Sequence, residues 1–409
     1  MKNILLITYD WAPGRTQLMP WRTIFEVAAR MRTKGINATI LSINKRTKNE
    51  QCKLYEDNNV PVVISNNLHI NPDQLCEHPV HGSAVPDIVF FPITWKSAFK
   101  GNKRWPKLAT PTIAYHGSAH YRLIDIARSY RYMTLRELFP YVLDATVPTK
   151  VLVNALKNRA INGVICMTNY NKNKLVENGW PDALISTIPP GINKEEKSNT
   201  PISENFTSLF KKNNPTFVFI GNALPIRGFE TLIDAVQIVL KRNTRIKIIC
   251  LVRSDPGNEL ALNKKILIKK LSGEIIRKHF FIIKRNCSRD EIQFAIKHSL
   301  AVVMPFLLVP SEIPLGILET MKEGGVVITT NSGGTSSFVG KSGLIASPAD
   351  PKSLSNQILL LLQNTDLEQK KRLLALHKMQ SHPNWDEVGD MWIRFAKHCL
   401  NLKTYLHEK

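Results

Sequence analysis

VPSEIPLGILETMKEGGVVITTNSGG, residues 309–334, decides the fold of this chain. The pattern predicts a loop that carries a carboxylate, a short helix over Leu315–Lys322, a Gly-Gly break, a buried strand over Val326–Thr330 and a second Gly-Gly turn. This order places a helix N-terminus beside the carboxyl end of a strand. In an open parallel α/β sheet, backbone N–H groups and the helix dipole at such a place favour negative charge. We therefore expect a phosphate-bearing small molecule to bind here.

Apolar strands alternate with helical stretches from one end of the chain to the other. The span Trp21–Lys34 is typical of an amphipathic helix that ends at a glycine, Gly35. Further helices are expected over Phe229–Lys241 and Arg289–Lys297. The other expected strands are Asn3–Tyr9, Ala38–Ile43, Val60–Ile64, Ile88–Phe91, Thr112–Tyr115, Gly163–Met167, Ile185–Ile188, Thr216–Ile220, Lys247–Val252, Phe280–Ile283 and Ala301–Pro305. Such alternation predicts βαβ units with parallel sheets.

A polar segment rich in Lys, Ser and Asn separates two such α/β series. With 409 residues, the chain is long enough for two domains of ordinary size. We predict an N-terminal domain over residues 1–195, a linker over 196–214, a second domain over 215–384 and a C-terminal helix over 385–409 that packs back on the first domain. A cleft between the two domains is then the expected active site.

The opening MKNILLITYDWAPG has the look of a secretion signal, but its apolar run is short. It reaches Asp10 without a cleavage site of small residues, and we interpret it as a buried strand. No later segment has the roughly 18 consecutive apolar residues that a membrane-spanning helix needs. Hydrophobic residues make up 43% of the chain, which fits a globular enzyme. A soluble or peripherally attached protein is therefore expected.

The six cysteines show no CxxC or other metal spacing. Cys166 and Cys250 lie inside apolar strands, as small core residues do, and reduced thiols in a cytoplasmic protein are expected. The chain also lacks an Asp-x-Asp pair and any His/Cys/Asp cluster at metal spacing, so a catalytic metal is not implied. No G-x-G-x-x-G follows the first strand, which disfavours a nicotinamide enzyme.

The net charge of +22 is spread along the chain and has more than one interpretation. One is a lysine-rich solvated surface. Another is attraction to an anionic membrane leaflet or a polyanionic acceptor, with candidate patches at residues 95–107 and 149–160. Nucleic acid is a third, and the chain holds no recognised nucleic-acid module, so we do not expect it as a partner.

Five segments, in the right order, carry a family resemblance. They are YDWAPG after the first strand, KGINATIL, NGVICMTNYNKNKLVENGWPDALISTIPPGIN, FVFIGNALPIRGFETLIDA and EIPLGILETMKEGGVVITTNSGG. Together they resemble the retaining, nucleotide-sugar-dependent glycosyltransferases of family 4 over nearly the whole chain. The resemblance implies an α/β, GT-B fold, with two facing Rossmann-like domains, parallel sheets and an inter-domain cleft. It also implies a nucleoside diphosphate sugar as donor substrate, with no cofactor.

The loop between Gly221 and Gly228 lies between a strand and a helix and can present backbone N–H groups to a diphosphate. Arg227 is the candidate side chain there, because a guanidinium binds phosphate oxygens bidentately. A solvated surface arginine is the alternative. The family usually has a second cation where this chain has Asn222. Glu319, by resemblance, accepts hydrogen bonds from the nucleotide ribose, the alternative being a surface glutamate.

The first glutamate of the family motif aligns with Ser311, and Glu312 is its neighbour, so the spacing here is Glu-x6-Glu. Either Glu312 takes the role of touching the donor sugar or that contact is lost; we favour the first. Backbone N–H groups of Ile313, Leu315 and Gly316 are further candidates for the phosphate or sugar.

His116, in TIAYHGSAH, follows a strand of the first domain. By resemblance it is the histidine that approaches the transferred sugar, and it is the catalytic candidate together with Glu312. The alternative is a structural histidine, and His120 is a weaker candidate. Gly14 would let the backbone approach donor or acceptor closely, unless it marks an ordinary turn. Trp385 resembles the aromatic residue that begins the final helix of the family, and packing is its expected role.

The resemblance therefore implies transfer of a hexose to a hydroxyl acceptor with retention, through a front-face displacement in which the leaving phosphate takes the acceptor proton. A glycan or lipid-linked acceptor is expected: a lipid-linked saccharide, a polysaccharide precursor or a small sugar. The basic N-terminal domain favours cell-envelope glycan synthesis at the inner face of the plasma membrane. A sugar-binding or scaffold subunit without turnover is the alternative, favoured by Asn222 and the shifted glutamate. A nucleotide-sugar epimerase is a further one. Contacts to the nucleobase are expected near Ile283–Lys284.

Overall fold

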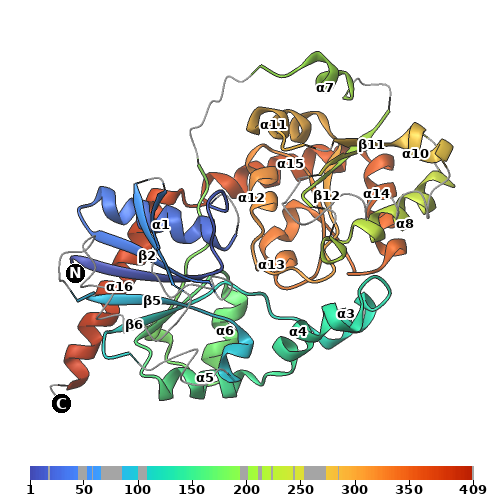
Figure 1. Ribbon diagram of the computed structural model, residues 1–409. Coiled ribbons are helices and arrows are strands. Elements are labelled where there is room, and N and C mark those ends of the chain that lie inside the picture. The colour runs from blue at the N-terminus through green and yellow to red at the C-terminus, as the bar shows by residue number, and fades with distance from the viewer. Residues whose placement is uncertain are drawn as a thin grey trace. The chain divides into compact units, whose positions relative to one another are not determined.

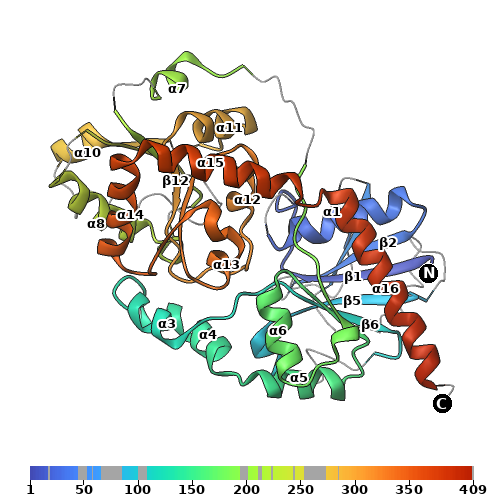
Figure 2. The ribbon, with the colours of Figure 1, turned by 180° about the vertical axis from the view of Figure 1, so that it is seen from behind.

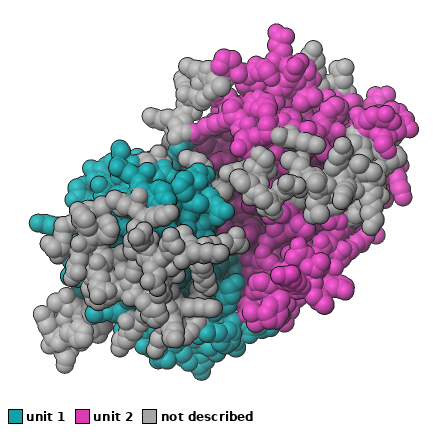
Figure 3. Space-filling model, viewed as in Figure 1, with its two compact units in different colours: residues 1–120, 146–193, 383–409 teal, residues 121–145, 194–382 magenta. Residues whose placement is uncertain are grey.

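The computed structural model describes residues 1–16, 19–44, 53–57, 59–65, 85–99, 108–193, 201–210, 214–222, 224–242, 245–252, 273–283 and 285–407 (Figure 1). The chain forms two compact units, which Figure 3 colours separately. Unit 1 comprises residues 1–120, 146–193 and 383–409, and unit 2 comprises residues 121–145 and 194–382. Each unit is an α/β layer structure around its own sheet, as the alternation of strands and helices predicts.

Unit 1 is built on an eight-stranded sheet in the order β3-β4-β2-β1-β5-β6-β7-β8. Its strands are β1 (Asn3–Tyr9), β2 (Asn37–Ile43), β3 (Lys53–Asp57), β4 (Val60–Ser65), β5 (Ile88–Ile93), β6 (Thr112–His116), β7 (Gly163–Cys166) and β8 (Ile185–Thr187). β3 is antiparallel to β4, and the other described neighbours are parallel. The helices are α1 (Trp21–Thr33), η1 (Trp95–Phe99), α5 (Thr149–Asn158), α6 (Asn169–Glu177), η2 (Asp182–Leu184) and α16 (Trp385–His407).

The parallel strands of unit 1 are apolar runs because a parallel sheet is covered on both faces. In β1, Ile4–Ile7 is buried throughout, and β5 buries Phe90 and Phe91 from opposite sides of the strand. α1 buries Ile24, Ala28 and Met31 at the spacing of one helix face and packs beside α16. The last helix of the chain therefore completes the first unit, and both views show α16 beside α1 (Figures 1 and 2).

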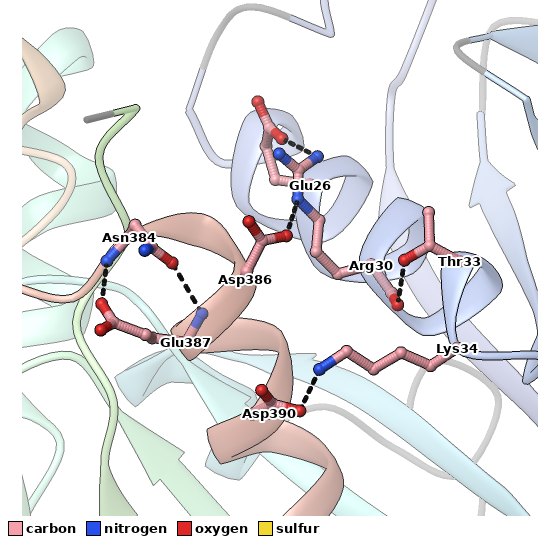
Figure 4. Close-up of polar contacts among 8 residues, drawn as sticks. All are labelled: Glu26, Arg30, Thr33, Lys34, Asn384, Asp386, Glu387 and Asp390. Atoms are coloured by element: carbon pink, nitrogen blue, oxygen red, sulfur yellow. Dashed lines mark hydrogen bonds and ion pairs between the residues drawn. The ribbon is translucent and has the colours of Figure 1, made fainter. Parts of the chain in front are cut away.

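α16 begins with a reciprocal cap. The amide of Asn384 donates to the Glu387 carboxylate at 2.7 Å, and the amide of Glu387 donates to the Asn384 side-chain oxygen at 2.8 Å (Figure 4). Trp385 is buried at this start, as expected for a packing residue. Two turns further on, the Trp392 ring lies against those of Phe90 and Tyr115, at centroid distances of 4.8 and 5.2 Å. Burial of these indoles stabilises the packing of the helix on unit 1.

Ion pairs add to this packing on the solvent side of α1 and α16. Arg30 bonds Glu26 of its own helix at 2.7 Å and Asp386 of α16 at 3.2 Å, and Lys34 pairs with Asp390 (Figure 4). Exposed pairs of this kind contribute on the order of 0–1 kcal/mol each. These pairs favour one register between the two helices and add little to the free energy of their packing.

Unit 2 is built on a parallel six-stranded sheet in the order β11-β10-β9-β12-β13-β14. Its strands are β9 (Thr216–Ile220), β10 (Lys247–Leu251), β11 (Phe280–Ile283), β12 (Ala301–Met304), β13 (Val327–Thr330) and β14 (Leu344–Ala346). Numbered within the unit, the order is 3-2-1-4-5-6, that of doubly wound nucleotide-binding sheets. The direction of winding reverses between β9 and β12, which places the loops after these two strands at the switch point.

The helices of unit 2 cover both faces of its sheet. They are α3 (Leu123–Ser129), α4 (Leu135–Thr146), α7 (Glu204–Ser208), η3 (Pro225–Arg227), α8 (Phe229–Leu240), α10 (Gly273–His279), α11 (Arg289–His298), α12 (Leu315–Lys322), α13 (Thr335–Val339), η4 (Gly340–Ser342), α14 (Pro351–Gln363) and α15 (Thr365–Gln380). α8 and α14 pack on each other and bury Leu232, Val236 and Ile358 in one core with the strands.

Residues 121–145 group with unit 2, although they lie within the range 1–195 expected for the N-terminal domain. The Tyr121 hydroxyl donates to the Val309 carbonyl at 3.0 Å, and the Tyr132 hydroxyl donates to Asp234 of α8 at 2.9 Å. These contacts join positions that are far apart in the sequence. Figure 3 shows the resulting division of the chain.

Part of the expected linker is structured. Within residues 196–214 the structure describes 201–210 and 214, and this part contains α7 with Ser203 as its cap. Phe206 and Phe210 are buried and lie 6.3 and 5.5 Å from the Phe294 ring of α11, centroid to centroid. Two phenylalanines of this polar segment therefore pack within unit 2, which the composition of the segment does not indicate.

Every strand named from the sequence is present, with ends within two residues of the prediction. β3, β14, α3 and α4 were not foreseen. No helix in the described part of the chain is long and apolar enough to cross a membrane.

Candidate functional site

The switch point of unit 2 is formed by two loops. One follows β9 and runs from Gly221 to Gly228, and the other follows β12 and runs from Pro305 to Pro314. In a sheet of this order, the loops after the first and fourth strands border the crevice where ligands bind. Both predicted donor-binding segments therefore lie at the same sheet edge.

Gly228 allows the backbones of these two loops to lie in close contact. Its φ is +72°, and a Cβ added there would lie 1.7 Å from the Pro305 carbonyl oxygen, so only glycine fits. The Leu307 amide also donates to the Ile226 carbonyl at 3.0 Å. This close approach of two backbones follows directly from the absence of a side chain at Gly228.

Arg227 is the last residue of η3, immediately before this glycine, and is half-buried. Its guanidinium carbon lies 5.3 Å from the Phe306 ring centroid, a cation–π contact that holds the side chain at the switch point. Tyr141 of α4 is also close: burial raises the pKa of its hydroxyl to about 12, and the Arg227 charge acts in the opposite direction. The loop thus offers a positioned cation beside a helix start, which suits a phosphate group.

The second loop is held by hydroxyl groups. The Val309 amide donates to Ser332 Oγ at 3.2 Å, while its carbonyl accepts from Tyr121. Thr330 Oγ1 donates to the Phe306 carbonyl at 2.6 Å. The strand β13 and the residues after it therefore fix the loop that leads to α12.

Glu312 is fully buried at the end of this loop. Its Oε1 lies 3.5 Å from the position that a Cβ on Gly334 would take, so the carboxylate points under the Gly333–Gly334 turn. Gly334 has φ +94°, a conformation that favours glycine. Neighbouring Ser311 is half-buried, and its hydroxyl approaches the Ile313 carbonyl at 3.5 Å. The sequence did not indicate that Glu312 would be covered.

α12 begins after Pro314, and its first-turn amides belong to the partly exposed residues Leu315 and Gly316. First-turn amides have no acceptor within an α-helix and are the natural donors to an anion. Ile313 precedes them and is buried. Glu319 lies one turn further along and is exposed. Gly221 opens the other loop with φ +130° and no atom within 4 Å of an added Cβ, so its surroundings are open.

In unit 1 the corresponding sheet edge gathers aromatic and imidazole rings. His116 is the last residue of β6 and is fully buried, with its ring centroid 4.8 Å from that of Trp95. Asn171 Nδ2 lies 3.4 Å from His116 Nδ1 and donates to the Ser118 carbonyl at 3.0 Å. Burial lowers the pKa of His116 to about 4, so the imidazole is neutral near pH 7.

His120 packs on the same indole, with its ring centroid 4.9 Å from that of Trp95. Burial, and then the charge of Lys174, lower its pKa to about 4. Among the described residues, His116 Nε2 and His120 Nδ1 are buried without a hydrogen-bond partner. Two neutral imidazoles with unused nitrogens suit a ligand that carries hydroxyl groups.

Other predicted residues of unit 1 have less packing around them. Gly14 follows β1, is exposed, has φ +82° and leaves open space where a Cβ would be. The patch at residues 95–107 is described only to Phe99, and Lys284 also lies outside the described residues. Trp95 and Asn171 were not predicted as site residues. A signal for Trp95 existed in its position directly after β5, next to β6 in the sheet.

Comparisons with known proteins agree with this geometry. Residues 214–364 match the family described as Glycosyl transferases group 1. Over 236 residues the chain is 27% identical to an uncharacterised glycosyltransferase of Methanocaldococcus jannaschii. That match covers 53% of this chain and 56% of the relative, so the chain spans little more than half the length of the curated relative it matches.

Two solved structures cover almost the whole chain. A glycosyltransferase from Rickettsia africae matches with a TM-score of 0.67 and 16% identity, over 98% of both chains. Anabaena HepE in complex with UDP and glucose matches with a TM-score of 0.64 and 15% identity, over 97% of this chain and 100% of that one. At such identities the likeness concerns the fold. The chain has the GT-B architecture, two α/β domains with parallel-dominated sheets, and the predicted fold class is confirmed.

The matched family segment lies in unit 2 and contains both switch-point loops and α12. The loops identified by their geometry therefore lie within the segment that is similar to group 1 glycosyl transferases. In the described part of the chain, no group of three or more His, Cys, Asp and Glu side chains is arranged to hold a metal ion.

Proposed function

We propose that this protein is a retaining glycosyltransferase that transfers a hexose from a nucleoside diphosphate sugar to a hydroxyl acceptor. The observation that carries the proposal is the switch point of unit 2, where Gly228 brings two loops together beside Arg227. The match of residues 214–364 to group 1 glycosyl transferases supports it. The GT-B fold, shared with a protein described in complex with UDP and glucose, supports it further.

In this proposal unit 2 binds the donor. Arg227 and the amides of Leu315 and Gly316 bind the diphosphate, because a guanidinium and first-turn amides are its natural donors. Glu319, which is exposed, accepts hydrogen bonds from the ribose hydroxyls. The amide of Ile313 and the Ser311 hydroxyl face the sugar in this assignment, and Gly221 admits the phosphate close to the backbone.

Glu312 requires a movement in this proposal. Its carboxylate is covered by the Gly333–Gly334 turn, so contact with the donor sugar needs that turn to shift. Glycines at both positions of the turn make such a shift inexpensive in backbone strain. In unit 1, His116 is assigned a hydrogen bond to a hydroxyl of the transferred sugar, and because its imidazole is fully buried this contact also needs the residues that cover it to shift. Gly14 follows β1 at the same sheet edge.

The proposed reaction is a front-face displacement. The acceptor oxygen bonds to the anomeric carbon on the face from which the diphosphate leaves. The bond between that carbon and the phosphate oxygen breaks, and the leaving phosphate takes the acceptor proton. Arg227 offsets the charge that develops on the leaving group, so the mechanism requires no metal ion and no separate carboxylate base.

We further propose an acceptor in cell-envelope glycan synthesis, a polysaccharide precursor or lipid-linked saccharide at the inner face of the plasma membrane. The net charge of +22 supports attraction to an anionic surface. An acceptor held in such a surface would be concentrated near the enzyme.

The proposal is tested by calorimetric titration with UDP-, GDP- and ADP-sugars, starting with UDP-glucose. We expect binding of one donor, slow hydrolysis of that donor, and an unchanged rate in excess EDTA. With an acceptor in hand, proton NMR of the product should show the anomeric configuration of the donor. Absence of binding across the panel would refute the enzyme assignment, and loss of activity in EDTA would refute the metal-independent mechanism.

A further inference from the structure

Helices α3 and α4 present apolar side chains to solvent. On α4, Leu135 is 72% exposed and Phe139 is 61% exposed. They are four residues apart and so lie one above the other on one helix face. The exposed residues Leu123, Ile124 and Tyr130 of α3 and its C-terminal end extend the apolar surface.

The inner faces of these helices are already used in packing on unit 2. Ile126, Met133 and Leu138 are buried, and Tyr121 and Tyr132 make the hydrogen bonds to Val309 and Asp234 described above. The exposed apolar residues of α3 and α4 are therefore distinct from the residues with which these helices pack on unit 2. α4 is apolar on both sides, and an exposed apolar surface of this kind marks an interaction site.

The charges around the apolar residues are mostly positive. Arg128, Arg131 and Arg136 are exposed, whereas Asp125 and Asp144 are buried. Within residues 121–145, which the structure describes completely, Glu137 is the exposed acidic residue. The surface therefore combines leucine, isoleucine and aromatic side chains with arginines, the composition of helices that lie in a membrane interface.

We propose that the α3–α4 surface, Leu123–Ser129 with Leu135–Thr146 and the turn between them, docks on an anionic lipid bilayer. Leu135, Phe139 and their apolar neighbours enter the interfacial region, and the arginines meet lipid phosphates. A second copy of the chain fits this surface less well than a bilayer does. A symmetric contact would bring the exposed arginines of one copy against those of the other with few acids between them.

Docking here deepens the proposed function, on which it rests for its biological meaning. The same segment holds the donor loop, since Tyr121 bonds Val309 and Tyr141 lies near Arg227. Membrane contact through α3–α4 therefore keeps the switch point of unit 2 close to a lipid-linked acceptor.

The test is flotation of the purified full chain with vesicles, without any nucleotide sugar. We expect the protein to float with vesicles of phosphatidylglycerol and phosphatidylcholine, and much less with phosphatidylcholine alone. A Leu135→Gln, Phe139→Gln double variant should bind anionic vesicles at least about tenfold more weakly. Arg128→Gln with Arg136→Gln should also lose about tenfold on anionic vesicles and little on neutral ones.

Leu373→Gln is the matched control, because Leu373 of α15 is 68% exposed and lies outside the proposed surface. It should float like the unmodified protein. Equal flotation of the apolar double variant, no flotation of the unmodified protein, or a dimer that the double variant abolishes would each overturn the proposal. If the apolar variant does not fold, the arginine variant decides. Donor titration of the same samples separates failure of docking from failure of the donor site.

Discussion

The two units differ in the groups that lie at the carboxyl ends of their sheet strands. In unit 2 the edge is made of backbone: Gly228 meets the Pro305 carbonyl, and Leu307 bonds Ile226. In unit 1 the edge is made of packed rings, with Trp95 in contact with both His116 and His120. Backbone amides beside a cation suit a diphosphate, whereas neutral imidazoles suit hydroxyl groups. Two α/β units thus present different chemical groups at equivalent places, through the residues that follow their strands.

The largest expected effect comes from closing the backbone contact in unit 2. Gly228→Ala places a Cβ against the Pro305 carbonyl and strains a left-handed residue, so unit 2 should lose at least about 3 kcal/mol of stability. Scanning calorimetry would measure the change. Gly14→Ala is the control: it has a similar φ of +82° but open space, and should cost only about 1–2 kcal/mol. Equal losses would show that the close approach is unimportant.

The stability of unit 1 should depend on pH through a histidine at the carboxyl end of β6. The pKa of His116 is lowered from 6.5 to about 4, so between these values the unfolded chain takes up a proton that the folded chain excludes. Stability should fall as pH falls through this window, by up to about 3 kcal/mol from His116. Melting temperatures measured across the window should fall less steeply for His116→Gln. An identical slope in both proteins would contradict a buried neutral imidazole.

The smallest of the three effects concerns the cation of unit 2. Arg227→Ala should weaken donor binding by roughly 1.5–3 kcal/mol, the usual contribution of a hydrogen bond to a charged group. Arg227→Lys keeps the charge and loses the planar guanidinium, so the donor affinity of this variant should lie between those of the unmodified protein and the alanine variant. Calorimetric titration with the donor measures both variants. Unchanged affinity in the alanine variant would remove Arg227 from the donor site.

The same contrast explains what the sequence could predict. Strands such as β9 and β11 are short apolar runs between polar segments, because both faces of a parallel sheet are buried, and their bounds were predicted without error. β3 has the sequence KLYED, in which charged residues at an edge strand hide the pattern. Its antiparallel pairing with β4 has no counterpart in the βαβ series.

The position of a candidate site residue in the fold could be predicted where it lies on a local strand–loop–helix pattern. The strand–loop–helix pattern from Thr216 to Leu240 identifies Gly221, Arg227 and Gly228 directly. Trp95 and Asn171 come from distant segments that meet only through the order of the strands, and an indole alone is typical of a core. The docking of residues 121–145 on unit 2 depends on two tyrosine hydroxyls whose partners no local pattern reveals.

The return of α16 to unit 1 has a consequence for synthesis on the ribosome. Residues 1–120 emerge first, but the helix that packs on Phe90 and Tyr115 emerges only after all of unit 2 has been translated. Domains that are continuous in sequence fold one after another as they appear. Here the unit whose translation starts first is completed last, and a nascent chain that stalls near residue 380 would leave Phe90 of β5 and Tyr115 of β6 without the indole that covers them.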